Sequence, residues 1–317
     1  MKNNINNKVK ELTVKLDEGV EEILTSDRFK EYLNQMSKFH NYSFSNSLLI
    51  GFQNPNATLV AGYKTWQNKF NRNVNKGEKA INILAPCPYK VKKDVEYINK
   101  ETGKKEIKTE EVVYPRFKVV SVFDVSQTSG EPLKEIAIEL QGECKNFEKL
   151  FKAIKECSEF DVQFESGIEE KGYCSAKNRK IVIKENMSQN QTIKTLIHEI
   201  AHEKLHFTEE SKKDSSNKKE IEAESIAYVV SNYYGIDTSS YSFDYISSWQ
   251  NKSKSDVKNS LSTIQETSNL LIEKIRSNLM LDKELSIEEK IKGAKSKSEK
   301  INNKKIDKKE KDKNISL

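Results

Sequence analysis

Three of the four histidines in this 317-residue chain lie within nine residues, at His198, His202 and His206. The first two belong to an HExxH pattern, in which Glu199 follows His198 directly. Two histidines four residues apart on a helix project from one face and can bind the same Zn²⁺ ion. A glutamate beside the first histidine can take a proton from a zinc-activated water. The pattern predicts zinc ligands at His198 and His202 and a general base at Glu199; the alternative is two ordinary helix histidines near a glutamate.

The segments around this pattern predict a strand followed by a helix. Residues 181–183 are β-branched and short enough for a strand, which could pair with the alternating segment 160–164. Ser188 and Gln191 then have the spacing of a capping box. We expect a helix over about 190 to 207, so that the HExxH pattern lies within the helix and not in a loop.

A zinc site needs a third protein ligand. His206 lies two turns beyond His198, which is too far along the helix axis to reach the same ion. A second helix is expected over 220–234, and in it Glu222 shares a face with apolar residues. A carboxylate on an apolar face is costly unless it meets a cation. We therefore predict Glu222 as the third ligand, with a salt-bridged helix glutamate as the alternative.

Two further glutamates flank this position in the second helix. Glu220 and Glu224 have more polar neighbours than Glu222. Solvation suits carboxylates in such surroundings, because they need no partner to offset burial. On this reasoning they are solvated residues and not ligands.

The two motifs together resemble the ImmA/IrrE family of zinc metallopeptidase-like domains. The resemblance rests on HisGluIleAlaHis and on GluAlaGluSerIleAlaTyr at 222–228, and it covers roughly residues 165–250. In that family a glutamate followed by alanine on a second helix completes a His-His-Glu site. The resemblance implies zinc bound by His198, His202 and Glu222, with Glu199 as general base.

The first 130 residues predict a separate unit of helices and strands. Apolar residues recur at helical spacing from Val9 to Phe39, with a break near Ser26. Segments 80–84 and 117–125 predict two paired strands, and the charged segment 89–115 between them predicts a protruding hairpin. The positive and negative charges of this hairpin nearly cancel, so it is a poor DNA-binding element on charge alone.

Four segments of this unit resemble the N-terminal domain of the ArdC antirestriction family. They are TyrSerPheSerAsnSerLeuLeuIle (42–50), the stretch from Gly62 to Trp66, LysGlyGluLys (76–79) and ValPheAspValSerGlnThr (122–128). The segments occur in the family's order and precede the zinc domain, which makes the set much more specific than any one of them. The resemblance implies a single-stranded DNA-binding domain of the kind carried by conjugative plasmids and transposons.

Proteins that bind single-stranded DNA need aromatic side chains to stack on bases and cations to contact phosphates. The candidates within the resembling segments are Tyr42, Asn46, Tyr63, Trp66, Lys76 and Lys79. The alternative for each aromatic residue is a place in the core, and the alternative for each lysine is a solvated turn.

The net charge of +6 does not describe the folded part of the chain. Residues 286–317 contain 11 lysines and 6 acidic residues, which leaves a net charge of only +1 for the rest. This tail lacks aromatic residues and cannot form a core, so we expect disorder there and, at most, salt-sensitive contacts with nucleic acid. Scattered cysteines, no segment of transmembrane length and an N-terminus without an apolar signal core predict a reduced, cytoplasmic protein away from membranes.

The sequence therefore predicts a two-domain α+β protein. We expect an ArdC-like unit of helices plus a hairpin over 1–128, a zincin-like HExxH domain over 129–283, and a disordered basic tail over 284–317. A helix is expected over 133–158 and a long closing helix to about 280. The expected function is single-stranded DNA binding of the antirestriction type with a zinc metallopeptidase-like domain. The alternative is a regulatory zinc endopeptidase that cleaves a repressor or another protein partner, with DNA binding auxiliary.

Overall fold

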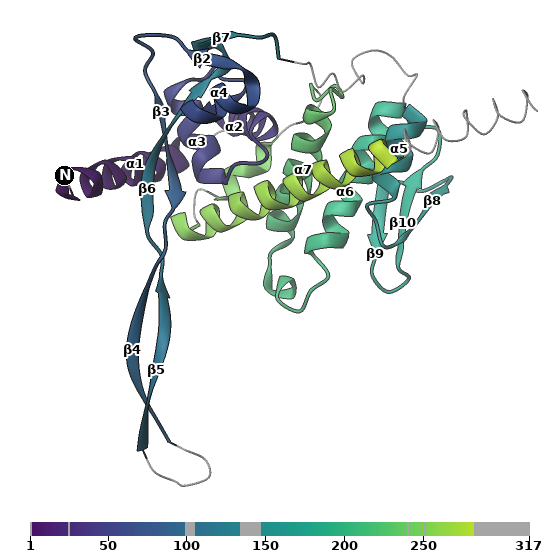
Figure 1. The fold of residues 1–317 in the computed structure, drawn as a ribbon. Coiled ribbons are helices and arrows are strands. Elements are labelled where there is room, and N and C mark those ends of the chain that lie inside the picture. The colour runs from purple at the N-terminus through teal and green to yellow at the C-terminus, as the bar shows by residue number, and fades with distance from the viewer. Residues whose placement is uncertain are drawn as a thin grey trace, which may run out of the picture.

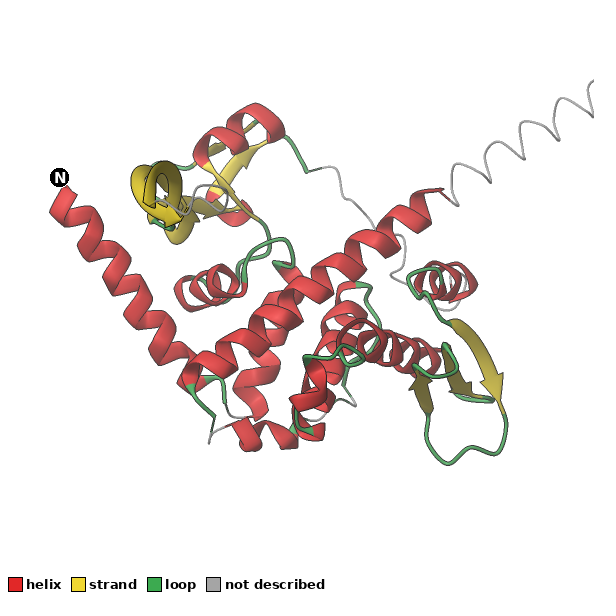
Figure 2. Cartoon of the chain, turned by 90° about the horizontal axis from the view of Figure 1, so that it is seen from below, coloured by secondary structure: helices red, strands yellow, loops and turns green. Residues whose placement is uncertain are grey.

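A computed structural model describes residues 2–24, 26–98, 105–133, 147–239, 241, 243–249 and 252–281. The predicted basic tail over 284–317 and residues 134–146 of the helix expected over 133–158 lie outside this range. Figure 2 shows the described strands in two groups, on opposite sides of a central layer of helices. The predicted α+β class is confirmed.

Three helices open the chain: α1 (Lys2–Glu22), α2 (Ser26–Lys38) and α3 (Phe44–Gln53). The break predicted near Ser26 separates α1 from α2. Ser43 caps α3 by accepting a hydrogen bond from the backbone of Asn46, which satisfies one of the free N–H groups at the start of the helix. The apolar positions recognised in the sequence face inward, with Val20, Phe29 and Leu33 fully buried.

A small antiparallel sheet follows, with strand order β1-β6-β3. Its members are β1 (Val60–Gly62), β3 (Ile81–Pro86) and β6 (Phe117–Asp124). The predicted pairing of 80–84 with 117–125 is confirmed, with Ile81 opposite Val122 and Leu84 opposite Val119. The short helix α4 (Tyr63–Phe70) and the strand pair β2 (Arg72–Val74) and β7 (Thr128–Gly130) pack beside this sheet.

The charged segment between β3 and β6 forms a long two-stranded ribbon of β4 (Tyr89–Ile98) and β5 (Lys105–Tyr114). The ribbon projects away from the rest of the molecule (Figure 1), and every residue of β4 is exposed. The predicted protruding hairpin is therefore confirmed.

The C-terminal half begins with α5 (Phe147–Lys155) and a three-stranded sheet of order β8-β10-β9. In this sheet β10 (Lys180–Lys184) runs parallel to β8 (Asp161–Glu165) and antiparallel to β9 (Gly172–Ser175). The pairing of 160–164 with 181–183 is thus confirmed. Two helices, α6 (Gln189–Leu205) and α7 (Ser216–Tyr233), follow the sheet, and a long helix over 254–281 ends the described chain.

The apolar core is continuous across the expected boundary at residue 128. One cluster of buried side chains combines residues of α1, α2 and α3 with residues of α5, α6, α7 and the helix over 254–281. Hydrogen bonds cross the same contact, from Tyr228 Oη to Asn34 Oδ1 at 2.7 Å and from Asn232 Nδ2 to Ser37 Oγ at 2.6 Å. Only the small sheet and its neighbours form a second cluster. The N-terminal helices therefore belong to the same packing unit as the HExxH helix.

Within the described ranges, no helix is both long enough and apolar enough to span a bilayer.

Candidate metal centre

The HExxH helix α6 is fixed at both ends and along its buried face. Ser188 caps its N-terminus by accepting a hydrogen bond from the backbone of Gln191, as the capping-box spacing predicts. Leu196 and Ile200 are completely buried against the core. The helix packs on β9 and β10 and lies against α7, so the HExxH residues face the second helix across a short gap.

Three donor atoms converge between α6 and α7. The Nε2 atoms of His198 and His202 lie 3.0 Å apart, and the two carboxylate oxygens of Glu220 lie 3.5 Å from them, one from each. One donor atom from each of these three residues lies within 4.8 Å of the other two. With zinc–ligand distances of about 2.0–2.2 Å, a tetrahedral ion separates neighbouring ligand atoms by about 3.3–3.5 Å. The donor triangle therefore brings three candidate ligand atoms close to the spacing of a tetrahedral ion, with the fourth position left to another ligand.

The open side of this triangle faces solvent. The side chain of Glu220 is 54% exposed, whereas those of His198 and His202 are 19% and 15% exposed. Structural zinc sites are closed by a fourth protein ligand, and catalytic sites leave that position to water or substrate. The donor set is thus of the open type.

Each histidine of the triangle has a partner for its other ring nitrogen. Nδ1 of His198 lies 3.0 Å from a carboxylate oxygen of Glu224, and Nδ1 of His202 lies 2.8 Å from Nδ1 of His206. A partner on Nδ1 leaves the lone pair on Nε2, which is the atom that faces the triangle.

Glu222, the residue expected as third ligand, is not brought to this triangle. Its carboxylate is buried, with only 4% of the side chain exposed, and it lies 3.2 Å from Nε2 of His206. The carboxylate that lies beside the two Nε2 atoms belongs to Glu220, which was expected to be solvated. The physical reason is that the two carboxylates lie at different depths. Glu220 lies at the rim of the packed helices, with 54% of its side chain exposed. Glu222 lies on the apolar face, where it meets His206 and not the histidine pair.

The electrostatics of the triangle are those of a cation site. Burial lowers the pKa of His198, but hydrogen bonds to Glu220 and Glu224 outweigh it and raise this pKa to about 10. Hydrogen bonds to His198 and His202 hold the pKa of Glu220 well below its usual range. Without a metal, these acceptors hold a proton on His198 tightly. A divalent cation would take the place of that proton and neutralise the negative charge of the carboxylates.

Glu199, the residue expected as general base, is buried next to the histidine pair. Only 6% of the residue is exposed. Burial raises the pKa of its carboxylate above the usual value, while the charges of His198 and His202 act in the opposite direction. A carboxylate with a raised pKa beside a metal site is suited to accept a proton and return it.

The six candidate DNA-binding residues divide into two groups. Trp66 is completely buried and donates its indole N–H to the carbonyl of Phe123 at 2.9 Å. Tyr42 is half-buried and donates its hydroxyl to the carbonyl of Val60, and Asn46 bonds both the N–H and the carbonyl of Leu84. In this conformation Trp66 cannot stack on a base, and its role is to join α4 to the sheet.

The other three candidates remain on the surface. Tyr63 is 49% exposed at the start of α4. Lys76 and Lys79 are exposed in the turn between β2 and β3, where Gly77 adopts a φ of +90° that side-chain-bearing residues rarely take. These residues are available to a ligand without any rearrangement.

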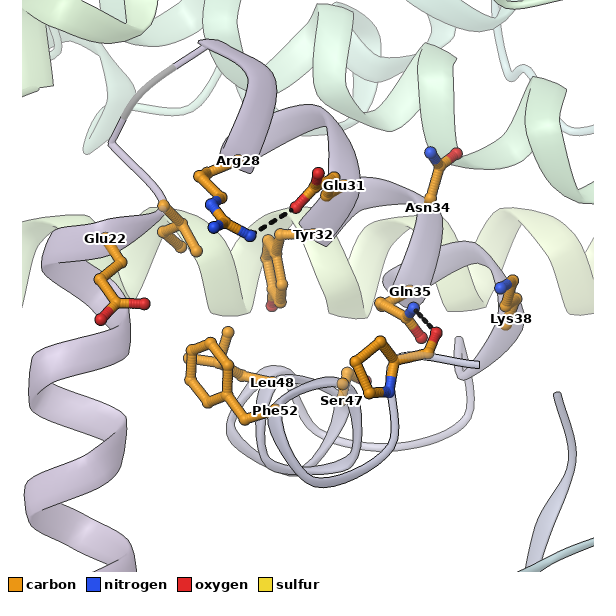
Figure 3. A pocket seen from close by; sticks show the side chains of 13 residues that line it. Glu22, Arg28, Glu31, Tyr32, Asn34, Gln35, Lys38, Ser47, Leu48 and Phe52 are labelled. Carbon is orange, nitrogen blue, oxygen red and sulfur yellow. Dashed lines mark hydrogen bonds and ion pairs between the residues drawn. The ribbon is translucent and has the colours of Figure 1, made fainter. Parts of the chain in front are cut away.

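One cavity of the described chain lies away from the histidines. It has a volume of about 500 Å³ and lies between α1, α2 and α3. Figure 3 shows Phe52 and Leu48 on one side and the Arg28–Glu31 ion pair on the other. None of the candidate DNA-binding residues is among its lining residues.

Comparisons with known proteins divide the chain in the same way as its motifs. Residues 2–123 match the family model for the N-terminal domain of anti-restriction factor ArdC. Residues 158–239 match the model for the IrrE N-terminal-like domain of the M78 peptidases. A curated relative is an uncharacterized protein of Bacillus anthracis, which is 28% identical over 279 residues. That alignment covers 77% of this chain and 47% of the relative, so the chain spans about half the length of that protein.

Two solved structures are similar to this chain, and both are crystal structures of the antirestriction ArdC protein from the R388 plasmid. The metal-free one is 18% identical, with a TM-score of 0.46, and the alignment covers 75% of this chain and 84% of that chain. The Mn(II)-bound one is 17% identical, with a TM-score of 0.45 and coverage of 74% and 84%. By the two family matches, the chain combines an ArdC-like N-terminal domain with an M78 peptidase-like domain.

Proposed function

We propose that this protein binds single-stranded DNA as an antirestriction-type factor and holds a Zn²⁺ ion in its peptidase-like domain. The observation that carries the metal proposal is the donor triangle of His198, His202 and Glu220, in which one donor atom of each residue lies within 4.8 Å of the other two. The DNA proposal rests on the match of residues 2–123 to the ArdC N-terminal domain. We also propose residue 128 as the boundary between the two functions, although the core is shared across it.

The residues proposed for the metal centre have separate tasks. His198, His202 and Glu220 bind the ion, and Glu224 holds the ring of His198 through Nδ1. Zinc bound there would supply Lewis-acid activation of a water and of a carbonyl group. Glu199 accepts a proton at its carboxylate and can pass it to a leaving amine, because burial has raised its pKa toward the working range of a base.

The proposed DNA surface consists of Tyr63, Lys76 and Lys79. Their exposure supports a role in binding, with the ring of Tyr63 for base stacking and the two lysines for phosphates. Tyr42, Asn46 and Trp66 are proposed to support this surface from within, since their polar groups are bonded to the sheet.

The test for DNA binding is fluorescence anisotropy of a labelled single-stranded oligonucleotide, titrated with the full chain over a range of salt concentrations. The double variant Lys76→Glu/Lys79→Glu should bind weakly and with a shallower salt dependence. The matched control is Lys212→Glu/Lys213→Glu, which makes the same change of charge at exposed positions of the other half. Equal binding by both variants would refute the assigned surface, and loss of binding on deletion of 284–317 would assign it to the basic tail.

A second function, regulatory proteolysis of a repressor or another protein partner, is favoured by Glu199. A buried base beside an open donor set is the arrangement of a hydrolytic centre and is unnecessary for a structural ion. The discriminating variant is Glu199→Gln, assayed for bound zinc and for protection of transferred DNA. Retained zinc with full protection favours the DNA-binding factor, whereas retained zinc with loss of function favours the protease.

The proposed place of action is the cytoplasm. The cysteines that the structure describes, Cys87, Cys157 and Cys174, are free thiols, which agrees with a reducing compartment.

A further inference from the structure

We propose that His206 and Glu222 form a buried hydrogen-bond relay that holds His202 in the tautomer able to bind a metal through Nε2. Both are positioning residues and neither is a ligand. This inference rests on the proposed metal centre. It assigns a task to the third histidine of the cluster, and to the glutamate that the sequence argument had taken as a ligand.

The relay is a continuous line of close polar contacts. Nδ1 of His202 lies 2.8 Å from Nδ1 of His206, and Nε2 of His206 lies 3.2 Å from a carboxylate oxygen of Glu222. The side chains of His206 and Glu222 are 3% and 4% exposed. Water therefore has little access to either contact, and each polar atom depends on its protein partner.

The order of protons along the line follows from the two ends. A metal at Nε2 of His202 takes the lone pair of that nitrogen, so the ring proton must lie on Nδ1. This proton needs an acceptor, which makes Nδ1 of His206 the unprotonated nitrogen of a neutral ring. The proton of His206 is then on Nε2 and is donated to the carboxylate of Glu222. A carboxylate only accepts, so this is the arrangement in which each of the two contacts joins one donor to one acceptor.

The carboxylate of Glu222 is otherwise hard to explain at its position. Its other oxygen, Oε1, has no hydrogen-bond partner among the described residues, and the nearest cation, Nζ of Lys218, lies 3.8 Å away. Lys218 is itself held at 2.8 Å by Asp214. Burying a carboxylate with so few donors is costly. We infer that its task is to accept the ring proton of His206, which leaves Nδ1 of His206 free to accept the proton of His202.

The two ligand histidines are thus supported in different ways. His198 has a direct carboxylate partner, Glu224, whose side chain is 38% exposed. His202 lies deeper, and its partner is the neutral ring of His206, with the carboxylate one step further away. His206 lies four residues after His202, and its backbone N–H donates to the carbonyl of His202 at 2.9 Å, so the end of the helix brings the two rings together.

The experiment measures the Zn²⁺ dissociation constant of the full chain by competition with a chelating dye. The variants are His206→Ala, which removes the acceptor, and His206→Asn, whose amide oxygen can replace Nδ1. We expect His206→Ala to bind zinc ~10- to 100-fold more weakly than the wild type, and His206→Asn to recover much of that loss. A role in packing alone predicts that both variants lose thermal stability while their zinc affinity stays unchanged, and that result would overturn the relay.

A second readout observes the protons directly. Long-range ¹H–¹⁵N correlation spectra of the zinc-loaded protein should show His206 as a neutral ring with its proton on Nε2. A proton on Nδ1 would overturn the relay, even if zinc binding were intact. Absence of zinc binding by the wild type would instead overturn the metal centre, and the relay with it. The two failures are therefore distinguishable.

Discussion

Replacement of Glu220 by alanine should weaken metal binding far more than an isosteric change at Glu222. Glu220 supplies the carboxylate oxygen of the donor triangle, and this oxygen lies 3.5 Å from Nε2 of His198. Zinc bound by four protein ligands is held with about 10–16 kcal/mol, so one ligand contributes about 2.5–4 kcal/mol. Glu220→Ala should therefore raise the Zn²⁺ dissociation constant by about 100- to 1000-fold. The assay is competition with a chelating dye, combined with metal analysis of the purified protein.

The matched variant for this experiment is Glu222→Gln. A glutamine at 222 keeps an acceptor for Nε2 of His206, so the relay loses only the charge at its end. We expect zinc affinity to fall by less than about tenfold. Removing a partner that supports a ligand typically costs about 10- to 100-fold in affinity, and glutamine keeps most of this partner's function. The reasoning would be refuted if Glu222→Gln weakened binding as much as Glu220→Ala, because Glu222 would then be a ligand as the sequence first suggested. Circular dichroism of both variants checks that helical content is unchanged.

Three further predictions concern the fold and the DNA surface. A fragment of residues 1–132 should show no cooperative melting by circular dichroism, since α1 and α2 share one apolar core with α7 and the helix over 254–281. Burial and Arg276 lower the pKa of His40 to about 4 from its ordinary value of 6.5. The neutral ring therefore contributes stability above pH 6.5, and this contribution is lost as the pH falls through 4. In urea unfolding, the His40→Asn variant should lose less free energy of unfolding than the wild type between pH 6.5 and pH 4. Trp66→Ala should cost about 3–5 kcal/mol of stability, because it truncates a core side chain. Tyr63→Ala should leave stability intact and cost about 1–3 kcal/mol of DNA affinity if one base stacks there. Unfolding measures the first effect, and fluorescence anisotropy measures the second.

Local elements could be predicted from the sequence because their signals are local. Hydrophobic periodicity identified α2, α6 and α7, and a serine three residues before a glutamine identified the start of α6. The charged segment between two predicted strands indicated the ribbon of β4 and β5. The shared core was not predicted, because the apolar face of α2 is compatible with many partners. Nothing in the spacing of its residues specifies α7 as that partner.

The two histidines of the site follow from the sequence more directly than the carboxylates around them. His198 and His202 follow from helix geometry, since four residues bring two rings to one side. The choice of Glu222 relied on the rule that a carboxylate on an apolar face needs a cation, and the carboxylate did find a polar partner, in His206. A cue was present in the spacing of Glu220 and Glu224, which are four residues apart and reach the two ring nitrogens of His198. A metal-binding histidine needs a partner on the ring nitrogen that does not bind the ion, and Glu224 supplies one at Nδ1. Glu220 then lies beside Nε2, where a proposed ion would be bound.

The position of α7 connects the two functional regions physically. This helix carries Glu220 and Glu224 toward the histidines, and two turns later Tyr228 and Asn232 bond to residues of α2. The arrangement of the donor triangle therefore depends on how α2 supports α7, because a helix transmits a tilt at one end to the other. Substitution of Asn34, which accepts the hydroxyl of Tyr228 at 2.7 Å, removes one of these supports without touching any proposed ligand. Asn34→Ala should thus weaken zinc binding measurably although no metal-binding atom has changed, and unaltered zinc affinity in that variant would show that the two regions share a core without sharing a mechanism.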